Sequence, residues 1–226
     1  MHSNDLTRRL GAEFLGTTFL LATIAGSGIM GETLAAGQAG TQASGVLLPH
    51  SLAIGAILFV MITLLGPVSG AHFNPAVSLA FVLRGEIGRR DASLYITTQI
   101  IAGIIGVWAA HLMFDLSILQ TSAKARTGIG QWSAELIATF GLVFTILAGL
   151  KVRPQAVPAL VGLYIMAALW FTASTGLANP AVTIARMLTD TFSGIAPADA
   201  PAFIIAQLTG AALAVPAARF LWPDES

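Results

Sequence analysis

The sequence contains no cysteine, and only 10% of its 226 residues are charged, against about 25% in a typical soluble domain. Without cysteine, a disulfide framework, a thiol nucleophile and a thiolate metal site are all excluded. The 11 basic and 11 acidic residues cancel, so there is no basic excess to neutralise phosphates and nucleic acid is not an expected partner. Since 55% of the residues are hydrophobic, the chain is not disordered. The charged residues are too few to cover the surface of a soluble domain. The composition predicts a polytopic all-α membrane protein, and its 23 glycines favour closely packed helices.

Six apolar stretches are long enough to span a bilayer, which takes about 20 helical residues. Two further apolar segments, near 75–84 and 180–189, have about ten residues each and are too short to cross. A secretory signal peptide also begins with cations and an apolar run, as residues near Arg8 and Arg9 do. The length of this run and its counterpart later in the chain favour a span instead. The six predicted spans lie near 9–31, 45–65, 92–114, 131–150, 156–173 and 200–221.

The distribution of cations predicts the orientation. With the N-terminus in the cytoplasm, Lys124, Arg126 and Arg186 fall outside. The other eight cations then fall inside, so we expect both termini to be cytoplasmic and the protein to lie in the cell (inner) membrane. Those eight are Arg8, Arg9, Arg84, Arg89, Arg90, Lys151, Arg153 and Arg219.

The chain repeats itself. N-P-A-V-S-L-A at 74–80 recurs as N-P-A-V-T-I-A at 179–185, with five of seven positions identical. A Glu in a span precedes each copy (Glu13, Glu135), and a Gln in a span follows each (Gln99, Gln207). The 61 residues from Glu13 to Asn74 exceed the 44 from Glu135 to Asn179, mainly because of a long loop near 31–45.

This pattern predicts one channel domain over 1–226, made of repeat one (1–115) and repeat two (130–226). Each repeat holds three spans, an odd number, so the second repeat enters the membrane in the opposite sense. Such an inverted repeat places a substrate pathway at its midplane. The two short segments then form re-entrant half-helices that meet near the centre. Gly55 and Gly162, at related points of the second and fifth spans, are expected helix-crossing sites.

The N-P-A segments have the residues that a half-helix start requires. Asn is a good N-cap, and Pro at the first helical position loses no needed hydrogen bond. We expect Pro75 and Pro180 to pack together, with Asn74 and Asn179 facing a shared lumen and with the small Ala76 and Ala181 allowing contact. Two helix N-termini then repel a dehydrated cation, while the Asn amides donate to a passing oxygen. Two unrelated Asn-Pro caps are the less favoured interpretation, because the whole heptad is duplicated.

The segment G-A-H-F-N-P-A-V at 70–77, the second N-P-A, the two glutamates and the six-span frame resemble the aquaporins, or major intrinsic proteins. The resemblance covers essentially the whole chain. It implies a right-handed helical bundle with one pore per subunit, a homotetramer in the lipid bilayer, and passive flow of water or small neutral solutes.

The intramembrane polar residues have two interpretations each. Glu13 and Glu135 are either proton relays or acceptors for the re-entrant loops, and the need of every loop N–H for a partner favours the second, as the resemblance does. His72 is either a pH gate or, as we favour, a residue that pins its own loop. Gln99 and Gln207 are expected to bond to loop backbone.

The chain departs from the family at the outer constriction. Most members have Arg directly after the second N-P-A, where this sequence has Val182. The other filter positions fall on Ile54, on Gly176, and on Leu169 or Ala167, with Leu169 preferred. This filter is wide and apolar, and bacterial channels of arsenic-resistance clusters resemble it in having Val there. It predicts passage of glycerol-type polyols and of arsenite and antimonite hydroxides.

Arg186 lies one helical turn beyond Val182. It either reaches the vestibule and repels cations or, as we favour, is a surface residue that pairs with Asp190 or binds loop carbonyls. Alternatives for the whole chain are a water-selective aquaporin, an ion-coupled secondary transporter or a non-conducting scaffold. An enzyme is not expected, because no nucleophile–base pair, metal cluster, cofactor or phosphate loop is visible.

Overall fold

The computed structural model describes residues 3–36 and 42–223, and within these ranges it is all helical. Six long helices are apolar enough to cross a membrane. They coincide with the six predicted spans, as expected for stretches in which the backbone must satisfy its own hydrogen bonds. Their bounds are α1 (Ser3–Ala35), α2 (Gln42–Ser69), α4 (Arg89–Met113), α5 (Ile129–Val152), α6 (Val157–Phe171, after the 3₁₀ turn Pro154–Ala156) and α8 (Ala200–Leu221).

The loop expected near 31–45 is shorter than predicted. Helix α1 continues to Ala35 and α2 already begins at Gln42, while residues 37–41 lie outside the described part of the chain. Residues at the ends of α1 and α2 were therefore predicted to be loop because they include glycine and threonine. The low helix propensity of these residues is a weak guide, because tertiary packing can keep them helical.

The first short segment forms helix α3 (Pro75–Arg84), which begins where the motif predicts. Asn74 has extended backbone (φ −157°), and its side chain accepts a hydrogen bond from the Ala76 N–H. This is an N-cap, and it satisfies one of the donors that a helix start leaves without a partner. The helix ends at Gly85, whose φ of 78° suits glycine.

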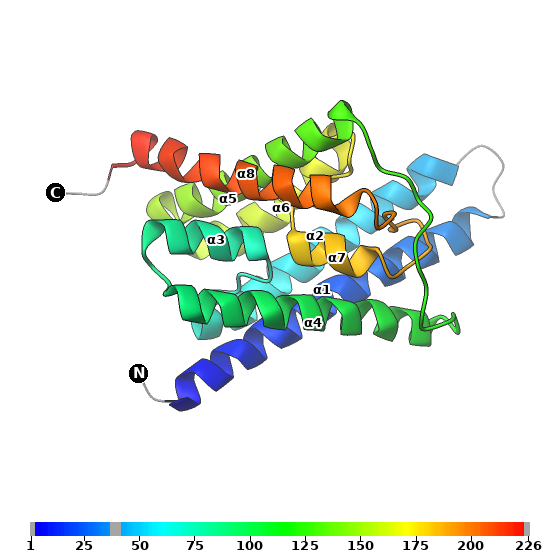
Figure 1. The fold of residues 1–226 in the computed structure, drawn as a ribbon, viewed down its shortest axis with the longest axis horizontal. Coiled ribbons are helices and arrows are strands. Elements are labelled where there is room, and N and C mark those ends of the chain that lie inside the picture. The colour runs from blue at the N-terminus through cyan, green and yellow to red at the C-terminus, as the bar shows by residue number, and fades with distance from the viewer. Residues whose placement is uncertain (1–2, 37–41, 224–226) are drawn as a thin grey trace.

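The second short segment forms helix α7 (Pro180–Arg186), three residues shorter than the predicted 180–189. Asn179 caps it in the same way, accepting from the Ala181 and Val182 N–H groups. Figure 1 shows α3 and α7 between α4 and α8, beginning close together in the middle of the bundle and running in opposite directions. The two half-helices therefore meet in the middle of the bundle, as the repeat predicted.

Helices α2 and α6 cross at a pair of glycines. A Cβ atom added to Gly162 would lie 2.7 Å from the Gly55 carbonyl oxygen, and one added to Gly55 would lie 3.0 Å from the Gly162 oxygen. Real Cβ atoms essentially never come as close to backbone as 2.7 Å, so the crossing requires glycine at position 162, and a Cβ at position 55 would be unusually tight. This crossing brings Ile54 and Ile165, neighbours of the two glycines, into the wall of one cavity.

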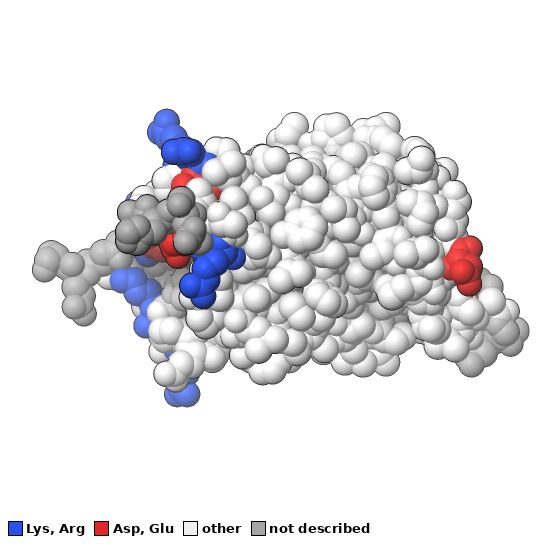
Figure 2. Space-filling model, turned by 90° about the horizontal axis from the view of Figure 1, so that it is seen from below, with Lys and Arg blue, Asp and Glu red and all other residues white. Residues whose placement is uncertain are grey.

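On the face seen in Figure 2, the charged side chains lie at the two ends of the bundle and leave a wide uncharged band between them. Both termini lie at the same end in Figure 1. Most Lys and Arg side chains visible in Figure 2 also lie at one end. This is the distribution of a multi-pass membrane protein, whose lipid-facing surface excludes charge.

Candidate pore

The two N-P-A loops are tied together by their asparagines. Asn74 donates from Nδ2 to the Ala178 carbonyl oxygen at 2.8 Å, and Asn179 donates from Nδ2 to the Phe73 carbonyl oxygen at 2.9 Å. Each Oδ1 accepts from the first turn of its own half-helix. The orientation of both amides is therefore fixed, with oxygen toward the helix and nitrogen toward the opposite loop.

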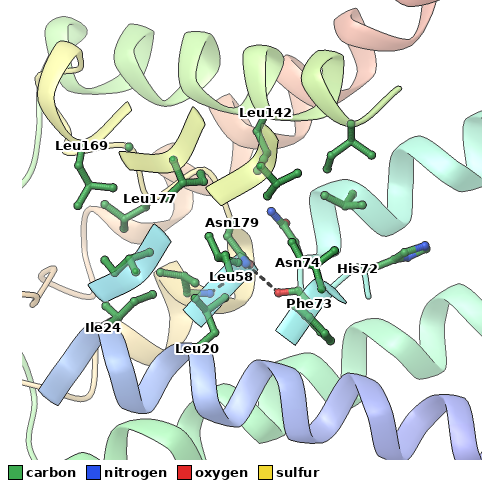
Figure 3. Close-up of a pocket in the computed structure, with 18 of the residues that line it drawn as sticks. Leu20, Ile24, Leu58, His72, Phe73, Asn74, Leu142, Leu169, Leu177 and Asn179 are labelled. Carbon is green, nitrogen blue, oxygen red and sulfur yellow. Dashed lines mark hydrogen bonds between the residues drawn. The ribbon is translucent and has the colours of Figure 1, made fainter. Parts of the chain in front are cut away.

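Both asparagines line one cavity, together with residues of both repeats (Figure 3). An amide nitrogen has two hydrogens, and the bond between the loops uses one of them. The second hydrogen of each Asn is left to donate toward the lumen. A water or hydroxyl oxygen in the middle of this cavity therefore meets donors from both sides, next to the positive ends of two helices.

The loop residues before each Asn adopt a strained backbone. Phe73 and Ala178, whose carbonyls accept the two Asn bonds, have φ values of 47° and 49°. This left-handed region is costly for residues with a Cβ and persists only where the surroundings enforce it. Two buried glutamates enforce it here.

Glu13 holds the first loop. It is fully buried and accepts from the backbone N–H groups of His72 at 2.9 Å and Phe73 at 2.8 Å. It also accepts from the Ser69 hydroxyl at 2.7 Å and from Gln99 Nε2 at 2.8 Å. Four donors thus converge on one carboxylate, as expected of a structural acceptor in a low-dielectric interior.

Glu135 holds the second loop in the equivalent way. It accepts from the N–H groups of Leu177 and Ala178, each at 2.9 Å, and from Gln207 Nε2 at 2.6 Å. The expectation that the glutamines bond to loop backbone is wrong. The glutamates take the loop N–H groups, and the glutamine amides instead complete the coordination of each carboxylate.

Gln99 makes a second bond, from Nε2 to the Ser78 hydroxyl of α3 at 3.2 Å, and Gln207 does the same to Thr183 of α7 at 2.8 Å. Each glutamine therefore links a buried carboxylate to the half-helix of its own repeat. They support the loops indirectly, through the carboxylates and the half-helices.

His72 is buried and lines the cavity beyond Asn74. Its Nδ1 lies 3.0 Å from the Ser78 hydroxyl, and its ring stacks on Phe81 with centroids 4.6 Å apart. The ring edge of Tyr95 contacts it from α4. These contacts favour the interpretation that His72 pins its loop to α3 and α4.

The four predicted filter residues line the same cavity: Ile54 of α2, Leu169 of α6, Gly176 of the second loop and Val182 of α7. Leu169 is buried at the lumen, whereas Ala167 is exposed on the outer side of α6. Of the two residues left open for the fifth span, Leu169 is therefore the one that lines the cavity. No charged group belongs to this set, and Leu20, Ile24 and Leu58 extend the apolar wall (Figure 3).

Arg186 is not the surface residue that we favoured. It is 4% exposed and lines the cavity, and it donates from Nε to the Ser193 carbonyl oxygen. Asp190, the expected partner, instead accepts from the Ala123 N–H. The chain after α7 folds back over the end of the half-helix, which buries Arg186. The part of the expectation that named loop carbonyls as acceptors is confirmed.

Arg126 is a candidate residue that sequence reasoning missed. It was counted only as an outer cation, but it is buried to 8% exposure between the loop after α7 and the loop before it. Its guanidinium donates to the carbonyls of Gly194 at 2.8 Å and Ser174 at 3.1 Å. Its neighbour Lys124 lies in the same segment, and no local sequence signal shows that this segment folds into the pore mouth.

Comparison with known proteins gives consistent results. The family model described as major intrinsic protein matches residues 1–176. The aquaglyceroporin AqpS of Rhizobium meliloti (strain 1021) is 55% identical over 221 residues, covering 98% of this chain and 93% of that protein. Aquaporin TIP1-2 of Musa acuminata is 32% identical over 187 residues, covering 76% of this chain and 71% of that protein.

The fold is also similar to a solved structure. The aquaglyceroporin from Plasmodium falciparum superimposes with a TM-score of 0.74 at 20% sequence identity, covering 96% of this chain and 98% of that one. At this identity the likeness shows the fold alone. It agrees with the six spans and two half-helices described above.

Proposed function

Since this chain belongs to the major intrinsic protein family, whose members are passive channels for small neutral solutes and not enzymes, we propose that its apolar filter admits solutes larger than water. Glycerol-type polyols and the neutral hydroxides of arsenic and antimony are the expected class. The observation that carries the proposal is the filter set Ile54, Leu169, Gly176 and Val182, which lines the lumen without a charged side chain.

The physical argument concerns volume and polarity. A guanidinium at position 182 would fill the lumen and impose hydrogen bonds on every solute, whereas valine does neither. A wide apolar wall suits a molecule that presents carbon on one side, while the Asn74 and Asn179 amides at the centre serve its hydroxyls. The 55% identical relative is named as an aquaglyceroporin, which supports the same class.

The test is stopped-flow light scattering on proteoliposomes with water, glycerol and arsenite. We expect the wild-type protein to pass all three, and Val182→Arg to lower glycerol and arsenite flux by about tenfold or more because it narrows and charges the filter. Val152→Arg is the matched control, because Val152 is 58% exposed at the far end of α5. Unchanged glycerol and arsenite flux in Val182→Arg would show that Val182 does not set the filter.

A wild-type protein that passes water but excludes glycerol would instead be a water-selective aquaporin. No solute-dependent change at all would indicate a non-conducting scaffold. The comparison of three solutes therefore separates these alternatives in one experiment.

The assembly is part of the proposal: a homotetramer in the cell membrane, with both termini in the cytoplasm and repeats at 1–115 and 130–226. The exposure of helices α2 and α6 supports a homotetramer, because only 22% and 28% of their apolar stretches are buried inside one subunit. Their outer surface forms an apolar groove that includes Phe59, Leu163 and Met166. Mass measurement of the protein released from lipid tests the number of subunits, and protease access to the C-terminus in sealed vesicles tests the orientation.

A further inference from the structure

Two buried arginines lie at the outer end of the lumen, beyond the filter. Arg186 is the last residue of α7 and lines the cavity, while Arg126 comes from the loop between α4 and α5. Three consecutive carbonyls of one segment accept from them. Arg126 donates to Gly194 and, at 3.5 Å, to Phe192, and Arg186 donates to Ser193 between them.

Within the described residues neither arginine forms a direct ion pair, although the buried carboxylate of Glu135 attracts both guanidiniums from further away. Carbonyl oxygens satisfy hydrogen bonds but neutralise no charge, and Arg stays protonated in proteins. Within residues 3–36 and 42–223, the only ion pairs are Arg9–Asp91 and Arg84–Glu86, both on the side of the termini. The nearby carboxylates bind backbone instead: Asp199 accepts from the Arg126 N–H and Glu32 from the Phe192 N–H.

A third cation, Lys124, lies close to these two arginines. Lys124 donates from Nζ to the Phe192 carbonyl at 2.7 Å. Its pKa is lowered, first by burial and then by the positive charges of Arg126 and Arg186. The two guanidiniums repel this ammonium group, while the carboxylates of Glu32 and Asp190 attract it.

Arg186 lines the cavity and has donors beyond the one that its loop uses. The hydrogen bond to Ser193 uses Nε, and within the described part of the chain no hydrogen bond involves its Nη1 or Nη2. A neutral solute at this point of the cavity can accept from these groups, whereas a cation is repelled by the positive charge.

We infer that Arg186 is the cation barrier of the outer pore, displaced by one helical turn from the apolar filter, and that Arg126 is a positioning residue for it. Two residues of α7 then have separate roles. Val182 keeps the filter apolar for neutral solutes, and Arg186, one turn further along the helix, excludes cations. Arg126 acts through the segment 192–194, and it also holds the filter loop through Ser174 and the Thr175 hydroxyl.

The inference rests on the proposed function, so both are measured on the same proteoliposomes. The readouts are glycerol flux and the potassium-to-chloride permeability ratio, obtained from reversal potentials. We expect Arg186→Gln, which keeps a donor but removes the charge, to raise potassium permeability about tenfold while glycerol still passes. Arg186→Lys, which keeps the charge, should remain closed to potassium.

Arg219→Gln is the matched control, because Arg219 is exposed near the end of α8 on the side of the termini. Arg126→Gln should raise potassium permeability less than Arg186→Gln, because Arg186 lines the cavity and Arg126 acts mainly by holding the segment around Arg186. Glycerol flux with no potassium leak in Arg186→Gln would overturn the inference alone. Absence of glycerol flux in the wild type would overturn the proposed function instead.

Discussion

Asn179 donates a hydrogen bond from its side chain to the carbonyl oxygen of Phe73, 2.9 Å away and 106 positions earlier in the chain. The reciprocal bond from Asn74 to Ala178 makes the junction of the half-helices a closed ring of backbone and amide groups. The asparagines of the two motifs therefore hold the two loops together and also line the lumen.

Replacement of Asn179 by Asp should make the pore permeable to cations. The carboxylate keeps the cap on α7 but loses the donor to Phe73, and it places a negative charge at the positive ends of two helices. Loss of the bond should also lower the free energy of unfolding by about 1–3 kcal/mol, because a buried acceptor loses its partner. Reversal potentials and thermal unfolding in detergent measure the two effects, and Asn74→Asp should give the same result because its contacts are equivalent.

Replacement of Glu13 or Glu135 by Gln should destabilise the protein more than it changes selectivity. The new amide group directs hydrogens at loop N–H groups that need an acceptor, and each buried donor without a partner costs about 1–3 kcal/mol. Glu86→Gln is the control, because Glu86 is exposed and its pair with Arg84 is worth little. A fully stable Glu13→Gln protein would contradict a structural role for this carboxylate.

Glycerol flux through the wild-type protein should not depend on a proton gradient. Coupling requires a titratable group on the pathway that is free to exchange protons. Both buried glutamates are occupied by loop donors, and His72, which lines the cavity, is held by Ser78 and Phe81. The measurement compares flux in proteoliposomes with equal and unequal pH across the membrane. Accumulation of solute driven by the gradient would identify an ion-coupled transporter.

Replacement of Gly162 by Val should disrupt the crossing of α2 and α6. The added Cβ would lie 2.7 Å from the Gly55 carbonyl, so the two helices must separate and displace the pore-lining Ile54 and Ile165. Overpacking of this kind costs about 1–3 kcal/mol. Gly11→Ala in α1 is the control, because its Cβ has no neighbour within 4 Å and alanine is favoured in helices by about 0.5–1 kcal/mol. Equal thermal stability of the two variants would argue against the crossing.

Much of the pore could be predicted from the sequence because its signals are local. The apolar runs require helices in a bilayer, and Asn-Pro fixes where a half-helix begins. The repeat then placed Glu13 beside the first loop and Glu135 beside the second. The partners of Gln99 and Gln207 were predicted wrongly, because a sequence does not show how loop N–H groups and glutamine amides are distributed over the same carboxylates.

Composition, spacing and N-cap chemistry were enough to predict the six spans and the two half-helices, because each of these signals is local. The choice between Leu169 and Ala167 depends on which face of α6 meets the lumen, and this follows from how the helices pack. The burial of Arg186 and Arg126 was also visible only in the tertiary structure. Their burial depends on how the loops after α4 and α7 fold over the pore mouth, and such irregular segments are held by long-range carbonyl contacts that carry no periodic signal.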